Sequence, residues 1–251
     1  MGQRAGSMSL KPDASGRFKI PPEPVNAVVS YARDHLAFLE QIYIWPFRRY
    51  PDGVDMGSVL STYAQTLRIK SFLAKAWANA SFEERVQLAE WAVRDWGGIS
   101  SGSDDRIEKF VRDICADRLG KKFDGMASYS KILAAIDPER FAIYDSRVAA
   151  SLNALQVIRN VENGLVFNVP QGRNKIVGDL TNKRGFSQEE RFKPRTLVNE
   201  RGWLRIRRDD TYEVYCQFMR AVLKKLPGEK LYRLEMLLFA SAESLAIEAM
   251  N

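Results

Sequence analysis

Apolar residues recur at helical spacing along most of this chain. The recurrence predicts helices over about 25–43, 56–78 and 82–96, from about 104, and in two stretches after 211. Ser81 and Glu84 have the form of a capping box at the start of the third helix, and Gly97 with Gly98 is expected to end it. The fold class expected from this pattern is all-α, or nearly so.

The pattern changes after residue 160. Residues 164–170 resemble a short strand, and residues 171–208 are polar with little periodicity. The latter stretch has eleven Lys and Arg residues against four Asp and Glu residues, so its net charge of +7 equals the surplus of the whole chain. We therefore expect a basic insertion over about 164–208. Trp203 within it is either a base-stacking or wedge residue or a packed side chain, and packing is the commoner role.

The composition narrows the class of protein. Hydrophobic residues make up 45% of the 251 positions, which is enough for a globular core. No apolar run is long enough for a transmembrane helix, and residues 1–24 lack the apolar centre of a signal peptide. We expect residues 1–24 to be a flexible tail, followed by a soluble, cytoplasmic, monomeric protein with no membrane partner.

Few residues are available for metal or triad chemistry. Cys115 and Cys216 do not form a CxxC pair, and two cysteines exclude a four-thiolate iron–sulfur cluster. His35 is the only histidine, so zinc-ligand spacing and histidine-based triads are absent, and we expect a surface or interfacial role for it. No metal and no cofactor are expected. The formal charge of +7 favours a polyanionic partner, with nucleic acid first.

Two adjoining helix starts carry candidate chemistry. Gly125 allows a tight connection and Ser128 is a natural N-cap, which puts Lys131 in the first turn of a short helix. The positive end of the helix dipole favours the neutral amine there, and a nucleophile needs that form. Asp145 opens the next helix, where free N–H groups favour a carboxylate. Spacing alone also allows a surface lysine and a simple N-cap.

The segment DGMASYSKILAAIDPERFAIYDSRVAASL, residues 124–152, resembles the helix–hairpin–helix and catalytic-aspartate region of the DNA glycosylase superfamily. It is most similar to bacterial proteins related to 8-oxoguanine DNA glycosylase. Lys131 matches the family's lysine position and Asp145 its aspartate position, while residues 232–240 resemble the return helix. The turn here has fewer glycines than in better-known members, and the gap between Lys131 and Asp145 is a few residues shorter.

The resemblance implies a single two-lobed helical domain over 25–251 that binds double-stranded DNA, with the helix–hairpin–helix and catalytic segment at about 109–157. A base flipped into a pocket between the lobes would be excised. Lys131 would attack the sugar C1′ as a Schiff-base nucleophile, and Asp145 would stabilise the positive charge on the sugar. The Schiff base would also permit strand cleavage. The implied substrate is an oxidised purine or a hypermodified, phage-type base, in repair or in phage defence, at the nucleoid.

The resemblance also implies a set of DNA contacts. Backbone amides at the hairpin, with nearby lysines, would hold phosphate, and basic residues of the insertion would grip the duplex. The residues implied are Lys121, Lys122, Gly125, Ala127, Ser128, Ser130, Arg147, Lys183 and Arg184. Arg147 would contact the DNA backbone or hold Asp145 in place, and a purely structural arginine is at least as common at such a position. For the insertion the alternative is a solvated loop.

Two further functions fit the same residues. A non-catalytic DNA-binding module would recognise damaged or modified DNA without cutting it, and Asp145→Asn would then leave every property unchanged. A helical adaptor would use residues 171–208 to hold a protein or RNA partner, with no preference for damaged DNA. A metal-dependent nuclease is disfavoured because no acidic cluster of the PD…(D/E)xK kind stands out.

Overall fold

The computed structural model describes residues 9–47, 49–54, 61–99, 103–118 and 123–251. The described chain is mostly helical, as the sequence predicts. The α-helices are α1 (Pro22–His35), α2 (Leu39–Ile42), α3 (Thr62–Asn79), α4 (Phe82–Trp91), α5 (Asp104–Cys115), α6 (Met126–Ile136), α7 (Ser146–Ile158), α8 (Pro194–Arg201), α9 (Thr211–Leu223), α10 (Leu231–Ala240) and α11 (Ala242–Met250). A π-helical turn, Ala92–Trp96, continues α4.

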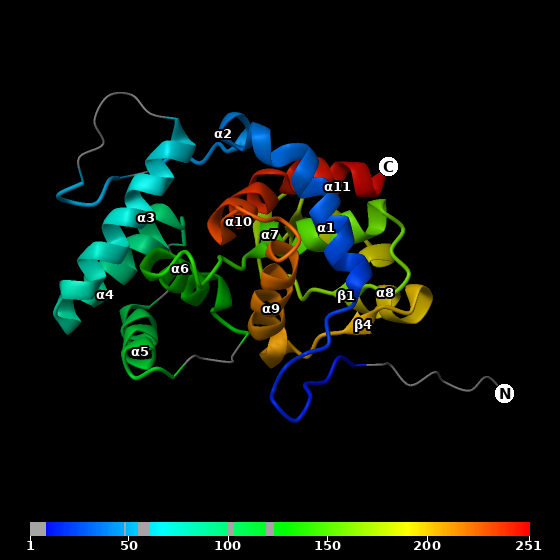
Figure 1. Ribbon diagram of the computed structural model, residues 1–251, viewed down its shortest axis with the longest axis horizontal. Coiled ribbons are helices and arrows are strands. Elements are labelled where there is room, and N and C mark those ends of the chain that lie inside the picture. Colours follow the sequence, from blue (N-terminus) through cyan, green and yellow to red (C-terminus); the bar gives the residue numbers. More distant parts are fainter. Residues whose placement is uncertain (1–8, 48, 55–60, 100–102, 119–122) are drawn as a thin grey trace.

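The helices gather in two groups that meet at α6 (Figure 1). Helices α3, α4 and α5 lie at one end with α6, and α1 packs with α7 and α9–α11 at the other. Helix α6 serves both groups because its two faces differ: Leu133 belongs to the large core, whereas Ile132, Ala134 and Ala135 pack with the apolar side chains of α3 to α5. A site beside α6 is therefore bounded by both groups.

Helix α7 is the central helix. Its residues from Val148 to Val157 are all buried, so it has no polar face, which is typical of a helix enclosed on every side. Two of its buried amides, those of Asn153 and Gln156, each exchange two hydrogen bonds with the backbone, at Phe167 and Leu165 respectively. These bonds satisfy both the side chains and the peptide groups, and they anchor the start of the basic insertion against the core.

The strands are short and belong mainly to the insertion. Strand β1 (Leu165–Val166) pairs in parallel with β4 (Leu204–Arg205), so the two ends of the insertion lie side by side. Strand β2 (Arg173–Asn174) forms an antiparallel pair with β3 (Gly178–Asp179). The insertion also has apolar contacts of its own, since the Phe186 and Phe192 rings stack with centroids 4.3 Å apart. A solvated loop is therefore not the structure of this segment.

Several sequence expectations are confirmed at the residue level. The Ser81–Glu84 capping box is present with both of its hydrogen bonds, and Gly97 follows the π-helical turn that ends the α4 helix. The helix expected over 25–43 begins at Pro22 and is interrupted by a 3₁₀ turn at Leu36–Phe38. His35 stacks on the Tyr31 ring with centroids 4.0 Å apart, which fits its expected structural role.

Residues 9–21 differ from the expected flexible tail. The Leu10 N–H donates to the Arg205 carbonyl at 2.9 Å, and the Phe18 N–H donates to the Gln217 side chain. The side chains of Leu10 and Phe18 are buried in the main core. These two apolar anchors are too far apart in sequence to form a periodic pattern, but they fix the segment across the insertion and α9. Residues 1–8 lie outside the described residues.

Trp203 is a packed residue rather than a wedge. It is 1% exposed, its indole N–H donates to the Val161 carbonyl at 2.9 Å, and its ring lies against Gly164, where a Cβ would come within 2.5 Å of it. We expect Trp203→Ala to lower the free energy of unfolding by about 3–5 kcal/mol, as for other fully buried aromatics. Urea denaturation measures this. The exposed Leu180 of the same insertion is the control, with an expected loss for Leu180→Ala below about 0.5 kcal/mol. A loss below about 1 kcal/mol for Trp203→Ala would contradict this packing role.

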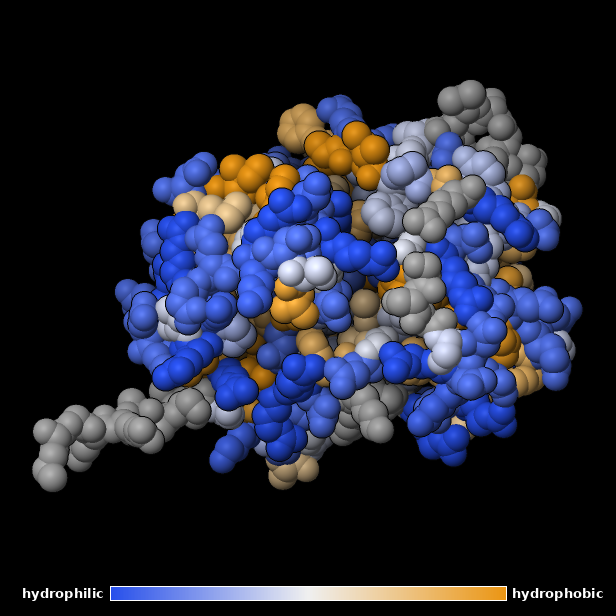
Figure 2. All heavy atoms as spheres, turned by 180° about the vertical axis from the view of Figure 1, so that it is seen from behind, coloured by the Kyte–Doolittle hydropathy of each residue, from blue (hydrophilic) through white to orange (hydrophobic). Residues whose placement is uncertain are grey.

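The surface is largely polar. Figure 2 shows one face on which hydrophilic residues predominate, with an apolar group along its upper edge. The large apolar side chains that are exposed among the described residues are Phe38, Ile42, Ile44, Tyr50, Leu180 and Ile247. Within the described part of the chain, no helix has both the length and the apolar character needed to cross a membrane.

Candidate functional site

Helix α6 begins three residues earlier than the sequence suggests. Its N-cap is Gly125, in the left-handed region at φ +84°, and the Ser128 N–H already bonds to the Gly125 carbonyl inside the first turn. The prediction of Ser128 as the N-cap is therefore wrong. Lys131 lies in the second turn, not the first, so the helix dipole no longer accounts for the neutral amine expected at this position. Glycine suits position 125 for two reasons. It tolerates the positive φ, and a Cβ there would lie 2.9 Å from the Phe110 ring.

The structure brings Lys131 and Asp145 together. The Lys131 Nζ is 3.6 Å from Asp145 Oδ2, and it also donates to the Ala127 carbonyl at 3.3 Å. The two side chains are 8% and 14% exposed respectively. An ammonium and a carboxylate are thus held close together with little access for water, where charge interactions are stronger than at a surface.

Asp145 is the N-cap of α7, as predicted. Its Oδ1 accepts hydrogen bonds from the backbone N–H groups of Arg147 at 3.0 Å and Val148 at 3.1 Å. These bonds use one carboxylate oxygen and fix the direction of the side chain. The other oxygen, Oδ2, faces the Lys131 ammonium. Asp145 therefore serves as a cap and still presents an oxygen to the site.

Ser130 is a clamp between α6 and the residue before Asp145. Its hydroxyl accepts from the Tyr144 N–H at 3.0 Å and donates to the Tyr144 carbonyl at 3.3 Å. The hydroxyls of Tyr212 and Tyr215 donate to the carbonyls of Ala142 and Ile143. These bonds satisfy the carbonyls of Ala142, Ile143 and Tyr144 and the N–H of Tyr144 in the buried part of the connector. Ser130 is 0% exposed, so its expected contact with DNA is not compatible with this structure.

A small pocket opens beside Lys131 and Asp145. It is lined by Tyr43, Trp45, Trp96, Gly97, Lys131, Ile143, Asp145, Glu235 and Phe239. These residues come from both groups of helices. Aromatic rings form much of the wall, and the Trp45 and Phe239 rings meet edge to face with centroids 5.1 Å apart. The cavity has a volume of about 30 Å³, close to that of one water molecule.

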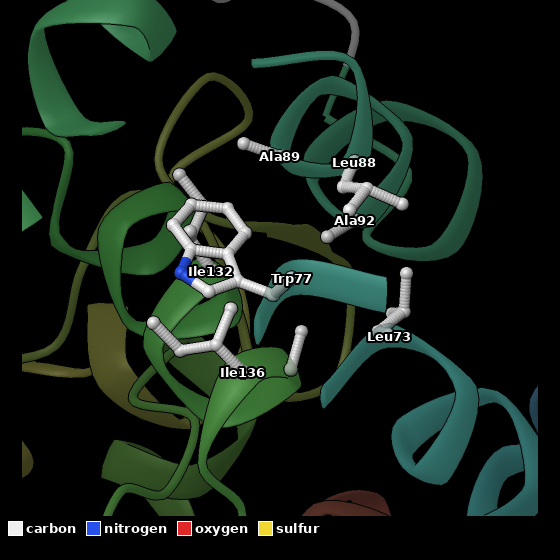
Figure 3. A pocket seen from close by; sticks show the side chains of 8 residues that line it. Leu73, Trp77, Leu88, Ala89, Ala92, Ile132 and Ile136 are labelled. Atoms are coloured by element: carbon white, nitrogen blue, oxygen red, sulfur yellow. The ribbon is translucent and has the colours of Figure 1, made fainter. Parts of the chain in front are cut away.

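A second pocket lies on the other side of α6 and is entirely apolar. Figure 3 shows its lining, in which Trp77 and Leu73 of α3 face Ile132 and Ile136 of α6, with residues of α4 above them. It contains no group that can bind or transfer a proton. We interpret this pocket as a gap in helix packing. The candidate functional groups of α6 therefore lie on the face that carries Lys131.

Glu235 and Lys70 form a second buried ion pair, which the sequence did not reveal. Lys70 Nζ of α3 lies 2.9 Å from Glu235 Oε2 of α10, and each side chain is 3% exposed. Burial raises the pKa of the Glu235 carboxyl, Lys70 acts against that rise, and Asp145 adds to it. The available signal was a charged residue on the apolar face of each helix, Lys70 beside Ile69 and Leu73, and Glu235 within LYRLEMLLFA.

The remaining candidates for DNA contact have different positions. Lys121 and Lys122 lie outside the described residues. Gly125, Ala127 and Ser128 are partly exposed at the start of α6. Lys183 and Arg184 are exposed in the turn after β3 and do not line the pocket. Arg147 is bonded to Glu243 at 2.9 Å and lies over the Phe239 ring, which agrees with the structural alternative for it.

The insertion nevertheless reaches the edge of the site. Gly172 packs so closely on Ser146, the first residue of α7, that a Cβ would collide with its hydroxyl. The Asn174 amide donates to the same Glu243 oxygen that Arg147 binds. Residues of the insertion are thus next to the helix start that carries Asp145.

No family model, curated protein or solved structure matches this chain. Among the described residues, no group of histidine, cysteine and acidic side chains is arranged to hold a metal ion.

Proposed function

We propose that the protein is a DNA glycosylase that excises a damaged or modified base, with Lys131 as the nucleophile. The observation that carries the proposal is the Lys131 Nζ, held 3.6 Å from Asp145 Oδ2 at the wall of a pocket between two groups of helices. A lysine amine is a nucleophile suited to a sugar carbon, and a carboxylate beside it is suited to the positive charge that develops there.

The reaction follows from these two groups. Lys131 gives up its ammonium proton, by way of Asp145 or a water molecule, to the departing base, and its neutral amine attacks the sugar C1′, so that a bond forms from Nζ to C1′. The glycosidic bond breaks, and its electron pair leaves with the base, which takes up that proton. Asp145 stabilises the charge on the sugar through the oxygen that is not used as a cap. Ring opening then gives a Schiff base, from which strand cleavage by β-elimination is chemically accessible.

The pocket supports recognition of a flipped base. Trp45, Trp96 and Phe239 provide aromatic surfaces of the kind on which bases stack. The cavity of about 30 Å³ is smaller than a base, so some of the lining side chains must move when DNA binds. The small size of this cavity is also the observation that favours the alternative, a DNA-binding module that recognises modified DNA without excising a base.

Charge supports DNA as the partner. The chain has a formal net charge of +7, and the insertion, with the same net charge, borders the start of α7. We propose that the insertion, including Lys183 and Arg184, contacts the duplex backbone, while the start of α6 holds a phosphate. The protein would act as a monomer at the nucleoid, without a metal or cofactor. An oxidised purine and a hypermodified base remain the two substrate classes.

Base release on a panel of duplexes tests the proposal. The duplexes carry 8-oxoguanine, uracil, a modified cytosine or an unmodified sequence, and the free base is quantified by mass spectrometry. Release from one modified duplex by the wild type, and not from the unmodified one, is expected. Selective binding to a modified duplex without release of any base would favour the non-catalytic module, and binding without selectivity would contradict both functions.

Gly97 makes room for Lys131, and its substitution tests the placement of the amine. A Cβ at position 97 would lie 2.5 Å from Lys131 Cδ and 2.6 Å from the Val93 carbonyl oxygen. Because the Val93 contact is to backbone, Gly97→Ala must displace either the turn or the lysine. We expect the single-turnover rate of strand cleavage at an abasic site to fall about tenfold to a hundredfold. An unchanged rate would contradict the assigned position of Lys131.

A further inference from the structure

Glu235 interacts electrostatically with charged or ionisable groups from several of the elements around the pocket. These groups are Lys70 on α3, Lys131 on α6, Asp145 before α7, Tyr215 on α9 and Tyr43 after α2. Burial raises the pKa of Tyr43 and of Tyr215, so both hydroxyls stay neutral near neutral pH and add no charge. The electrostatic balance is therefore set by two ammonium groups and two carboxylates.

Lys70 is fixed as the partner of Glu235. Its Nζ lies 2.9 Å from Glu235 Oε2 and over the rings of Trp96 and Tyr232, with centroids 5.5 and 6.0 Å away. Ring faces stabilise a cation at these distances. Lys131 has a different partner, since its Nζ is 3.6 Å from Asp145. Each lysine thus has its own carboxylate, and both carboxylates line one small pocket.

The pairing has a consequence for the nucleophile. A buried carboxylate that lost Lys70 would be stabilised by the next positive charge, which is Lys131. The Lys131 ammonium would then be held by two carboxylates rather than one. A stronger hold favours the protonated form, and the protonated form has no electron pair with which to attack C1′.

We propose that Lys70 is a positioning residue that controls the protonation of Lys131 by neutralising Glu235. This inference rests on the proposed function, because it assigns Lys70 and Glu235 to the same reaction. Lys70 does not touch the sugar or the base. It acts through Glu235, and Glu235 acts through its charge. Removal of Lys70 alone and removal of Glu235 alone must therefore have opposite effects on the protonation of Lys131.

The pH dependence of borohydride trapping on an abasic duplex tests the inference. The rate rises as Lys131 loses its proton, so the midpoint of the rise reports on the amine. Lys70→Met is expected to move the midpoint up by about one pH unit, because Glu235 then stabilises the ammonium. Glu235→Gln is expected to move it down by about one unit. The double variant, which removes one charge of each sign, should return close to the wild type.

A surface lysine supplies the matched control. Lys230 lies 3.2 Å from Glu139, and both side chains are more than half exposed. Lys230→Met removes the same charge as Lys70→Met, and its midpoint should stay at the wild-type value. If Lys70→Met does not fold, Glu235→Gln and the double variant still decide the question. A role in stability alone would lower the rate by one factor at every pH, and that result would overturn the inference, as would two shifts of the same sign.

A second measurement needs no DNA. Reductive methylation of Lys131 by formaldehyde and a borane reductant requires the neutral amine, and mass spectrometry of the Lys131 peptide follows it as a function of pH. The same opposite shifts are expected in the two variants. If these opposite shifts appear while neither the wild type nor any variant reacts with abasic DNA, the proposed function fails. The control of Lys131 protonation by Lys70 and Glu235 then still stands. If the wild type reacts with DNA but Lys131 methylates identically in all variants, the control fails alone.

Discussion

Lys131→Gln is expected to reduce base release by at least about 10³-fold and to abolish strand cleavage at an abasic site. Glutamine keeps much of the length of the side chain and can still hydrogen-bond the Ala127 carbonyl, which Lys131 binds at 3.3 Å. It offers no basic nitrogen to attack C1′. Single-turnover kinetics on the duplex that the wild type processes measures the loss.

The matched control for that loss is Lys230→Gln. It removes one positive charge from an exposed ion pair with Glu139. It also lowers the net positive charge that attracts DNA by the same amount as Lys131→Gln. Its base release should stay within about twofold of the wild type, as for most surface substitutions. Equal activity of Lys131→Gln and Lys230→Gln would rule out Lys131 as the nucleophile.

Asp145→Asn is expected to lower the rate of base release by about 10²- to 10³-fold, because the sugar charge loses a preorganised counter-charge. The fold should be preserved, since asparagine is as good an N-cap as aspartate and its amide oxygen can accept the N–H groups of Arg147 and Val148. The free energy of unfolding should nevertheless fall by up to about 3 kcal/mol, because the buried Lys131 ammonium, 3.6 Å away, loses its counter-charge. Activity is measured by base release and stability by urea denaturation.

The comparison of Asp145→Asn with Asp145→Ala separates the two tasks of this residue. Alanine removes both the charge and the cap, so it should cost about 1 kcal/mol of stability beyond the cost of asparagine, in addition to the loss of activity. Base release retained by Asp145→Asn would contradict the role of Asp145 in excision. Specific binding of modified DNA that is the same for Asp145→Asn and the wild type, with no base released by either, would support the non-catalytic module in place of the glycosylase.

Local features of the site could be predicted from the sequence because they depend on neighbouring residues. Asp145 precedes a helical apolar pattern and has the side chain that an N-cap requires, so its position needed no tertiary information. The capping box at Ser81 is a feature of the same kind. The start of α6 was misplaced because Gly125 takes a positive φ and serves as the N-cap itself, where Ser128 has the better side chain for that role.

Non-local features could not be predicted in the same way. Lys70 and Glu235 are 165 residues apart and meet only because α3 and α10 both pack around the pocket. Leu10 and Phe18 gave no periodic signal, yet they hold residues 9–21 on the core. The insertion lacks helical periodicity because its buried residues lie on short turns, on strands and on the short helix α8, where a pattern has too little length to appear.

The helical class of the fold is confirmed, while the glycosylase architecture remains a prediction from the resemblance. The resemblance and the geometry point to the same two residues by separate routes. The sequence motif selected Lys131 and Asp145 without coordinates, and the structure places their charged groups 3.6 Å apart in a shared pocket. The proposed charge control by Lys70 and Glu235 rests on the structure alone.

Identification of the residue that is covalently trapped on DNA tests the central claim most directly. The wild-type protein is incubated with sodium borohydride and a duplex carrying the base that it releases, or an abasic duplex, and the digested complex is sequenced by mass spectrometry. We expect the reduced sugar adduct on Lys131, within the peptide that contains Ser130 and Ile132. An adduct on another lysine or on the N-terminal amine, or no adduct on a duplex whose base is released, would contradict the assignment of Lys131 as the nucleophile.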